Sequence, residues 1–153
     1  MLDNREVLLE ENVNLDLKAG TKEEVFTQMT RMLYENGVIR EEQPFIDELV
    51  HREAEGVTGI GEGIAIPHGR SAVVNRSVIA IGRTRTDVSW ETFDDKPVRC
   101  IIMFAIRDVD MSQHIMLLSH VAQLLLDKDV IDTLHHARTV EEIVNILRKE
   151  ESE

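Results

Sequence analysis

The stretch "VRCIIMFAI", residues 98–106, decides the fold class of this chain. Its apolar residues follow one another without the three- to four-residue spacing of an amphipathic helix, and several of them are β-branched. Such a run predicts a strand that is buried on both faces. "SVIAIGR", residues 77–83, has the same character. Asp94, Asp95 and Pro97 lie between the two runs and are typical of turns, so we expect two buried strands joined by a loop.

Four other segments have the apolar spacing and the end signals of helices. They are residues 21–37, 41–56, 112–127 and 139–150. Thr21 with Glu24, and Thr139 with Glu142, have the spacing of a capping box at a helix start. Helices interleaved with apolar strands predict an α/β fold in layers, and the length fits a single domain over residues 1–153. These patterns leave the strand order open.

The chain has 153 residues and a formal net charge of −12. A chain with this charge is repelled by a phosphate backbone, so we expect no general binding to nucleic acid. A net negative charge also suits partners with basic surfaces, although many proteins are acidic for solubility alone.

The one cysteine, Cys100, lies inside the first apolar run, where we expect a small buried hydrophobic residue rather than a nucleophile. It has no partner for an internal disulfide, which favours a reducing compartment. The start of the chain lacks the basic residues and apolar core of a signal peptide. No apolar run approaches the roughly 20 residues that span a bilayer. We therefore expect a cytoplasmic protein.

A histidine between a proline and a glycine marks the stretch "GIGEGIAIPHGR", residues 59–70. Pro67 has a fixed φ and biases the residue before it toward an extended conformation, so His68 leaves a strand end in a set direction. Gly69 allows a turn or a close backbone approach. The glycine-rich part offers unhindered N–H groups that suit an anion, but no Lys-Ser/Thr follows as in a Walker loop. The alternative is a tight turn in which His68 packs.

The six histidines also raise the question of a metal site. His135 and His136 are adjacent and would point about 100° apart on a helix. His114 and His120 are six residues apart, which puts them on different helix faces. No HExxH pattern occurs. A small metal-binding module stays an alternative without support from spacing, and we predict no metal and no cofactor.

The pattern E-x6-I-G-x2-I-A-I-P-H-G, from Glu53 to Gly69, resembles the signature of a known family. This is the fructose/mannitol (type 2) EIIA family of the bacterial phosphoenolpyruvate-dependent sugar phosphotransferase system. The resemblance extends over nearly the whole chain, from a leading strand and two helices to a later helix that carries His114 before two leucines. It implies a mixed β-sheet flanked by helices in a layered sandwich.

The resemblance also implies a function and a set of site residues. His68 would accept a phosphoryl group from phospho-HPr and pass it to a cysteine of an EIIB domain, which makes the chain a phosphotransferase. Arg52, Glu62 and His114 would support the histidine. Contact with a membrane would come only through EIIB and the membrane component EIIC. A neutral imidazole held in line with the phosphorus, with N–H donors and a cation around it, needs no metal.

Each supporting residue has an alternative interpretation. Arg52 lies near the end of the second predicted helix, where a cation interacts favourably with the helix dipole. His114 shares a helix face with Leu117, as a core histidine would. Glu62 would repel an arriving phosphoryl group, so it either orients another side chain or is a solvated turn residue. Arg70 is predicted to be a surface charge or a partner contact.

A second function class is open. Nitrogen-type EIIA relatives have the same fold and histidine but act by binding other proteins according to their phosphorylation. A neighbouring EIIB or EIIC sequence in the genome would favour transport, and an isolated position would favour regulation. The segments "GIAIPHGRS" and "IAIGRT" look more like fructose-type than mannitol-type members. No pattern specifies an oligomeric state.

Overall fold

The two predicted strands form the centre of a six-stranded mixed sheet in the computed structural model, which describes residues 7–148. They are β5 (Val78–Val88) and β6 (Val98–Arg107), and they pair antiparallel with Ile81 opposite Ile102. The loop predicted between them is confirmed. Both predicted strands are therefore confirmed, and each is longer than its apolar run.

The remaining strands lie on either side of this pair. β1 (Val13–Leu17) runs parallel to β5, while β3 (Ile64–Ala65) and β4 (His68–Ser71) run parallel to β6. β2 (Gly59–Gly61) pairs antiparallel with β3. A short 3-10 helix, η1 (Glu10–Asn12), precedes β1. The strand order is β1-β5-β6-β3-β2. β3 and β4 pair with the same edge of β6, β3 with its first half and β4 with its second half.

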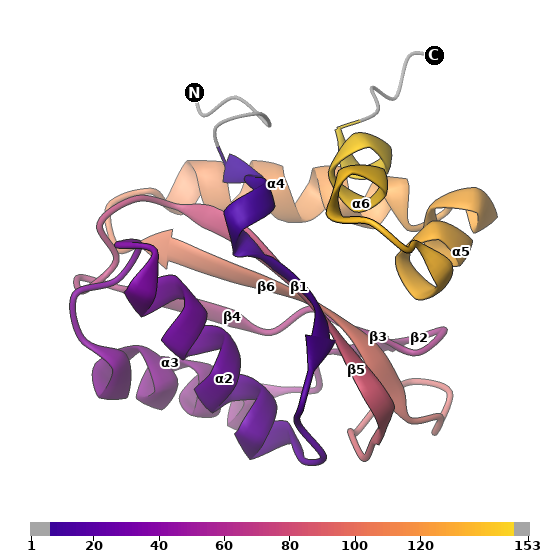
Figure 1. Ribbon diagram of the computed structural model, residues 1–153. Helices are drawn as coiled ribbons and strands as arrows, with labels where there is room; N and C mark the ends of the chain where they lie inside the picture. Colours follow the sequence, from indigo (N-terminus) through magenta and orange to yellow (C-terminus); the bar gives the residue numbers. More distant parts are fainter. Residues whose placement is uncertain (1–6, 149–153) are drawn as a thin grey trace.

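Helices cover both faces of this sheet (Figure 1). They are α2 (Lys22–Glu35), α3 (Glu42–Glu55), α4 (Met111–Leu124), α5 (Lys128–His136) and α6 (Val140–Leu147). α2 and α3 lie on one face, and α4, α5 and α6 lie on the other. The layered sandwich with a mixed sheet is thereby confirmed.

The helix ends follow the predicted capping residues. The side chains of Thr21 and Thr139 accept hydrogen bonds from the backbone N–H groups of Glu24 and Glu142. The helix predicted over residues 112–127 is shorter, because Asp127 caps a separate helix, α5, which the sequence pattern did not predict. The end of the last predicted helix, residues 149–150, lies outside the described residues.

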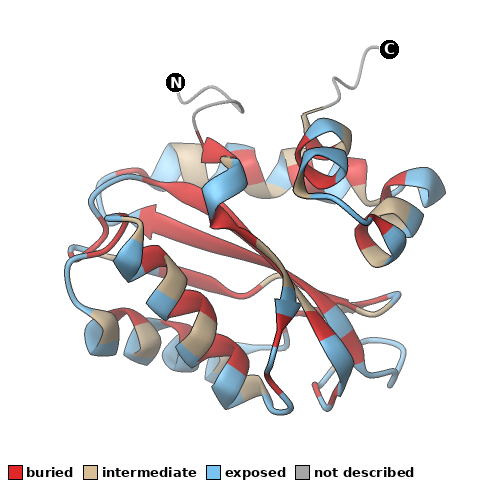
Figure 2. Ribbon diagram, in the orientation of Figure 1, coloured by how far each residue is buried: buried red, intermediate tan, exposed pale blue. Residues whose placement is uncertain are grey.

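Both faces of β6 are buried, which explains its uninterrupted apolar sequence (Figure 2). Side chains alternate between the faces of a strand. Ile101, Met103 and Ala105 belong to the core under α2 and α3. Cys100, Ile102, Phe104 and Ile106 belong to the core under α4, α5 and α6.

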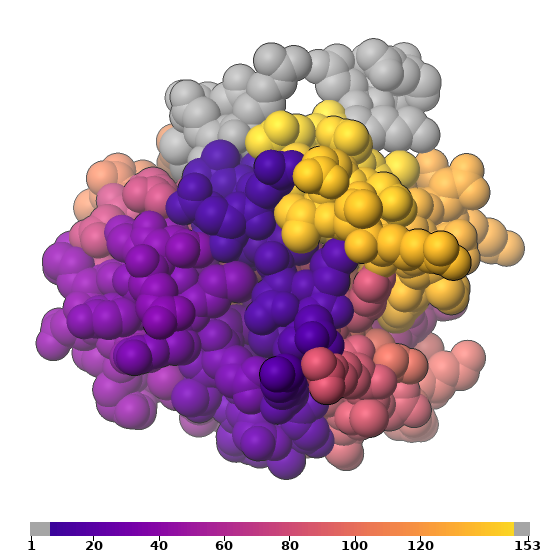
Figure 3. Space-filling view, viewed as in Figure 1, coloured from indigo at the N-terminus to yellow at the C-terminus, as the bar shows by residue number. Residues whose placement is uncertain are grey.

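The two ends of the described chain meet at the surface (Figure 3). Arg148, directly after α6, donates a hydrogen bond from Nη2 to the carbonyl of Leu8 at 2.8 Å. The single-domain prediction also includes residues 1–6 and 149–153, which lie outside the described residues. Within residues 7–148, no helix has the length and apolar content that a membrane span requires.

Candidate active site

His68 is the first residue of β4 and lies opposite Phe104 of β6. The carbonyl of Pro67 accepts a hydrogen bond from the backbone N–H of Phe104, which ties the Pro-His pair to the central strand. A Cβ atom added to Gly69 would lie 2.6 Å from the ring of Phe45 on α3. Gly69 therefore serves a close approach between α3 and β4. It does not form a turn.

A cavity of about 560 Å³ opens beside His68 at the edge of the sheet. α3, β4, the β6–α4 loop and α4 contribute to it. Its lining consists of charged residues and histidines: Glu48, His51, Arg52, Glu55, His68, Arg70, Asp108 and His114. Three of the four predicted site residues, His68, His114 and Arg52, therefore share one cavity.

The two cavity histidines lie edge to face. Their ring centroids are 5.3 Å apart, and the ring planes meet at 89°. Nδ1 of His68 and Nε2 of His114 are buried and make no hydrogen bond within the described residues. A buried ring nitrogen without a protein partner is unusual, and a catalytic role or a bound water or ion can account for it.

The start of α4 is held next to this pair. The carboxylate of Asp110 accepts hydrogen bonds from Ser77 Oγ at 2.8 Å and from Arg107 Nε at 2.9 Å. Asp110 is the N-cap residue, but its side chain makes no capping hydrogen bond. The first turn of α4, which includes His114, therefore keeps N–H groups that can serve an anion.

Burial makes both cavity histidines weak bases. It lowers the pKa of His68 from 6.5 to about 4, and the nearby His114 and Arg52 act in the same direction, while the carbonyls of Pro67 and Ile66 partly oppose them. The pKa of His114 is lowered by burial and by the charges of Arg70 and Arg52. A neutral imidazole has a free nitrogen lone pair, so His68 can act as a nucleophile at neutral pH.

Arg70 lines the cavity as well, where the sequence predicted only a surface charge or a partner contact. It lies two residues after His68 in the same strand, and alternate residues of a strand face the same side. Recognising β4 as a strand would have placed Arg70 beside the histidine. With Arg52 it supplies two cations to the cavity, which suits an anionic group.

Glu62 does not line this cavity. It lies in the turn between β2 and β3, with a φ of 58°. Its backbone N–H donates to Asp94 Oδ2 at 3.0 Å, and its carbonyl lies 2.6 Å from Nε2 of His135. These contacts match the turn-residue alternative, because the β2–β3 hairpin carries Glu62 away from His68.

Cys100 is fully buried, and burial raises the pKa of its thiol to about 12, as suits a core residue. Among residues 7–148, no group of three or more His, Cys, Asp or Glu side chains is arranged to hold a metal ion.

A family model described as "Phosphoenolpyruvate-dependent sugar phosphotransferase system, EIIA 2" matches residues 6–150. The chain belongs to this EIIA family. The predicted resemblance is thus confirmed, and membership supports a transferase role. A fructose-specific EIIABC component from Bacillus subtilis (strain 168) is 31% identical over 94% of the chain. The chain spans only 23% of that protein.

Two solved EIIA structures share the fold. The nitrogen regulatory protein IIA-Ntr from Neisseria meningitidis is 31% identical, with a TM-score of 0.84 over 93% of this chain and 97% of that one. The complex of enzyme IIAMTL and phosphorylated enzyme IIBMTL from Escherichia coli matches at 28% identity and a TM-score of 0.75. That match covers 90% of this chain and 94% of that one.

Proposed function

We propose that this EIIA chain is a phosphocarrier that accepts a phosphoryl group on His68 from phospho-HPr and passes it to the cysteine of an EIIB domain. The observation that carries the proposal is the cavity around His68. In it a neutral, buried imidazole faces a second histidine and two arginines. The proposed location is the cytoplasm, and the proposed domain spans residues 1–153.

The reacting atom follows from burial. Nδ1 of His68 is buried, so Nε2 is the nitrogen that can meet a donor in the cavity. As the bond from phosphorus to the donor breaks, a bond forms from Nε2 to phosphorus, and the imidazole proton stays on Nδ1. Transfer to the EIIB thiolate reverses this step. No metal has to bind, because arginine and N–H donors can stabilise the charge on the oxygens.

Each helper then has a defined task. Arg52 and Arg70 balance the negative charge of the phosphoryl group, and His114 donates a hydrogen bond to one of its oxygens. The first turn of α4 adds backbone N–H groups. Glu62 is left out of this mechanism, since it lies in the β2–β3 turn and does not line the cavity.

The proposed partners draw on the relatives. The structure from Escherichia coli is a complex of enzyme IIAMTL with phosphorylated enzyme IIBMTL, which supports an EIIB acceptor for this chain. The Bacillus subtilis relative is fructose-specific, which favours a fructose-type pathway. EIIA contacts carrier proteins rather than sugar, so the sugar itself is selected elsewhere in the system.

A regulatory function is the second candidate, because of the nitrogen regulatory structure. That structure matches at a TM-score of 0.84, against 0.75 for the mannitol complex. In this case His68 is still phosphorylated, but the output is binding to another protein in one phosphorylation state only.

Incubation with phosphoenolpyruvate, enzyme I and HPr tests the proposal. We expect one acid-labile phosphoryl group, mapped by mass spectrometry to residues 59–70, and none in His68→Gln. His136→Gln is the matched control, since His136 is exposed on α5 and outside the cavity. Label on another residue, or none in the wild type, would refute the proposal. Transfer onward to EIIB favours transport over regulation.

A further inference from the structure

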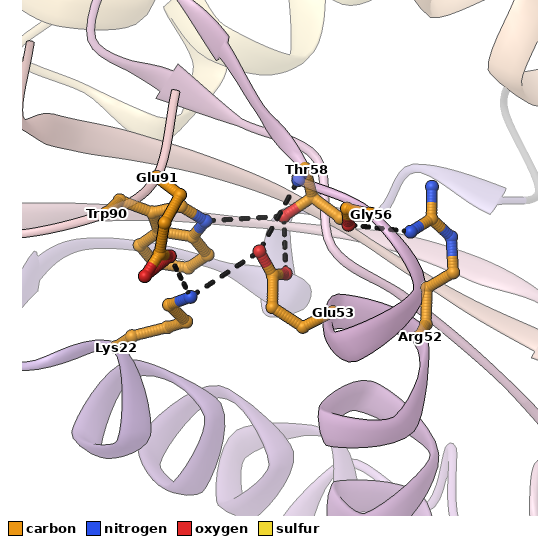
Figure 4. A network of polar contacts seen from close by, with 7 residues as sticks. All are labelled: Lys22, Arg52, Glu53, Gly56, Thr58, Trp90 and Glu91. Carbon is orange, nitrogen blue, oxygen red and sulfur yellow. Dashed lines mark hydrogen bonds and ion pairs between the residues drawn. The ribbon is translucent and has the colours of Figure 1, made fainter. Parts of the chain in front are cut away.

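Figure 4 shows a polar network centred on Glu53, the residue that follows the cavity residue Arg52 in α3. The Glu53 side chain is only 10% exposed. Its Oε1 accepts a hydrogen bond from Thr58 Oγ1 at 2.6 Å, and its Oε2 accepts one from the Thr58 backbone N–H at 3.4 Å. One carboxylate at the end of α3 therefore holds two groups of a residue in the segment that follows the helix.

Lys22 and Trp90 complete the network. Lys22 Nζ lies 3.5 Å from Glu53 Oε2 and 2.5 Å from Glu91 Oε2, and it is 5.4 Å from the centre of the Trp90 ring. Trp90 Nε1 donates to Thr58 Oγ1 at 3.3 Å. Burial lowers the pKa of Lys22, but the two carboxylates more than offset it, so the pKa is raised and the cation persists. The buried charge of Glu53 is therefore paired, as such a charge must be.

The network continues toward the reactive histidine. The carbonyl of Thr58 accepts a hydrogen bond from the Ile66 N–H at 2.9 Å. Ile66 precedes Pro67, whose ring fixes the direction in which the chain enters His68. A movement of Thr58 would therefore displace Ile66 through this hydrogen bond. The stiff Ile66–Pro67 segment would in turn displace the imidazole of His68.

The same segment also holds Arg52, one of the two arginines that line the cavity. Arg52 Nη1 donates to the carbonyl of Gly56 at 2.9 Å. Figure 4 shows Arg52 and Glu53 extending to different sides of α3. Arg52 binds Gly56 and Glu53 binds Thr58, so both side chains hold the short segment that follows the helix. The positions of Arg52 and His68 are therefore linked through a segment that Glu53 anchors.

We propose that Glu53 is a positioning residue, which holds Thr58 so that His68 and Arg52 keep the relative geometry that phosphoryl transfer needs. The inference rests on the proposed function and assigns Glu53 no contact with the phosphoryl group. Positioning supplies most of the catalysis in this chemistry, and small displacements lower the rate strongly.

The test compares Glu53→Ala and Thr58→Val with Glu91→Gln as matched control. The Glu91 carboxylate binds the same Lys22, but within residues 7–148 it accepts no hydrogen bond from Thr58, which donates to Glu53 instead. We expect Glu53→Ala to lower the limiting transfer rate from phospho-HPr about 10- to 100-fold, with the half-saturating concentration within about twofold. Thr58→Val should act in the same direction. Glu53→Gln, which keeps an acceptor for the hydroxyl, should recover most of the rate, and Glu91→Gln should match the wild type.

Titration of the His68 imidazole by NMR is the second readout. In Glu53→Ala the segment loosens, water reaches the ring, and the pKa of His68 rises from about 4 toward 6.5. This measurement needs no phosphoryl group. If the wild type accepts none, the proposed function fails, while the titration still tests Glu53.

A folded Glu53→Ala variant with wild-type rate and wild-type His68 titration would overturn the inference. Equal slowing in Glu91→Gln would also overturn it, since the effect would then belong to the charge of Lys22. If Glu53→Ala does not fold, Thr58→Val decides, and wild-type values in that variant overturn the inference.

Discussion

At the scale of single residues, the environment of His68 separates its two ring nitrogens. One nitrogen, Nδ1, is buried, and the residue as a whole is 7% exposed. The pKa of about 4 leaves the ring neutral at physiological pH. A nucleophile must be unprotonated when it attacks, so burial, with a smaller contribution from His114 and Arg52, prepares this residue for its proposed chemistry.

His114 offers a test at the same scale. Its ring lies edge to face with His68 and lines the same cavity, so we expect an imidazole N–H of His114 to donate to a phosphoryl oxygen on His68. We expect His114→Ala to slow transfer from phospho-HPr by about 10- to 100-fold, less than in a fully dry site because the cavity admits water. His114→Gln should recover part of the loss. Rapid-quench kinetics measures the rates.

Circular dichroism serves as the folding control for the His114 variants. Equal transfer rates in the wild type and both variants would return His114 to the interpretation as a core histidine. Loss of folding in His114→Ala would lead to the same conclusion.

At the scale of elements, the contact between α3 and β4 aligns the two sides of the cavity. α3 carries Arg52 and β4 carries His68, and the two elements approach closely at Gly69. The ring of Phe45, which is fully buried, fills the space where any side chain at Gly69 would lie. The distance between α3 and β4 is therefore set by a residue that lacks Cβ.

Gly69→Ala should separate these elements. The added Cβ would lie 2.6 Å from Phe45, so we expect a loss of about 1–3 kcal/mol in the free energy of unfolding, measured by urea denaturation. Phe45→Leu in the same chain should relieve part of the clash. Gly20→Ala is the control, because its nearest neighbour would be the flexible end of Glu24 at 3.6 Å. A Gly69→Ala protein as stable as Gly20→Ala would contradict this account of the contact.

At the scale of the whole molecule, the buried histidine couples stability to pH. In the unfolded chain His68 takes up a proton below about pH 6.5, whereas in the folded protein it does so only near pH 4. The unfolded state therefore binds more protons between these values, and the free energy of unfolding falls as the pH drops from 6.5 to 4. The full loss from this one group is about 3 kcal/mol.

Urea denaturation at pH 7, 6 and 5 measures this dependence. His68→Gln carries no titrating group at this position, so its stability should fall less steeply over the range. His114, whose pKa is also lowered, contributes in the same direction to both proteins. Identical slopes for the wild type and His68→Gln would show that His68 titrates normally in the folded protein.

Much of the fold could be predicted from local sequence. The run at residues 98–106 indicated a strand buried on both faces, and β6 has helices on both sides. The two capping boxes marked helix starts because a cap involves residues only three positions apart. The signature ending at Gly69 identified the family. Local periodicity and spacing are sufficient for such features, since burial and capping act within one element.

The site required the tertiary structure. Packing of α3 and α4 at the end of β4 brings Arg52 and His114 into one cavity with His68. The β2–β3 hairpin carries Glu62 away from it, although Glu62 is the nearest of the predicted helpers in sequence. The link from Glu53 through Thr58 to Ile66 likewise joins a helix end to a hairpin. By itself the sequence determined the layers and the family, and it predicted His68 as the reactive residue. Which side chains surround that histidine was decided by strand pairing and helix packing, because these bring together residues that no local pattern connects.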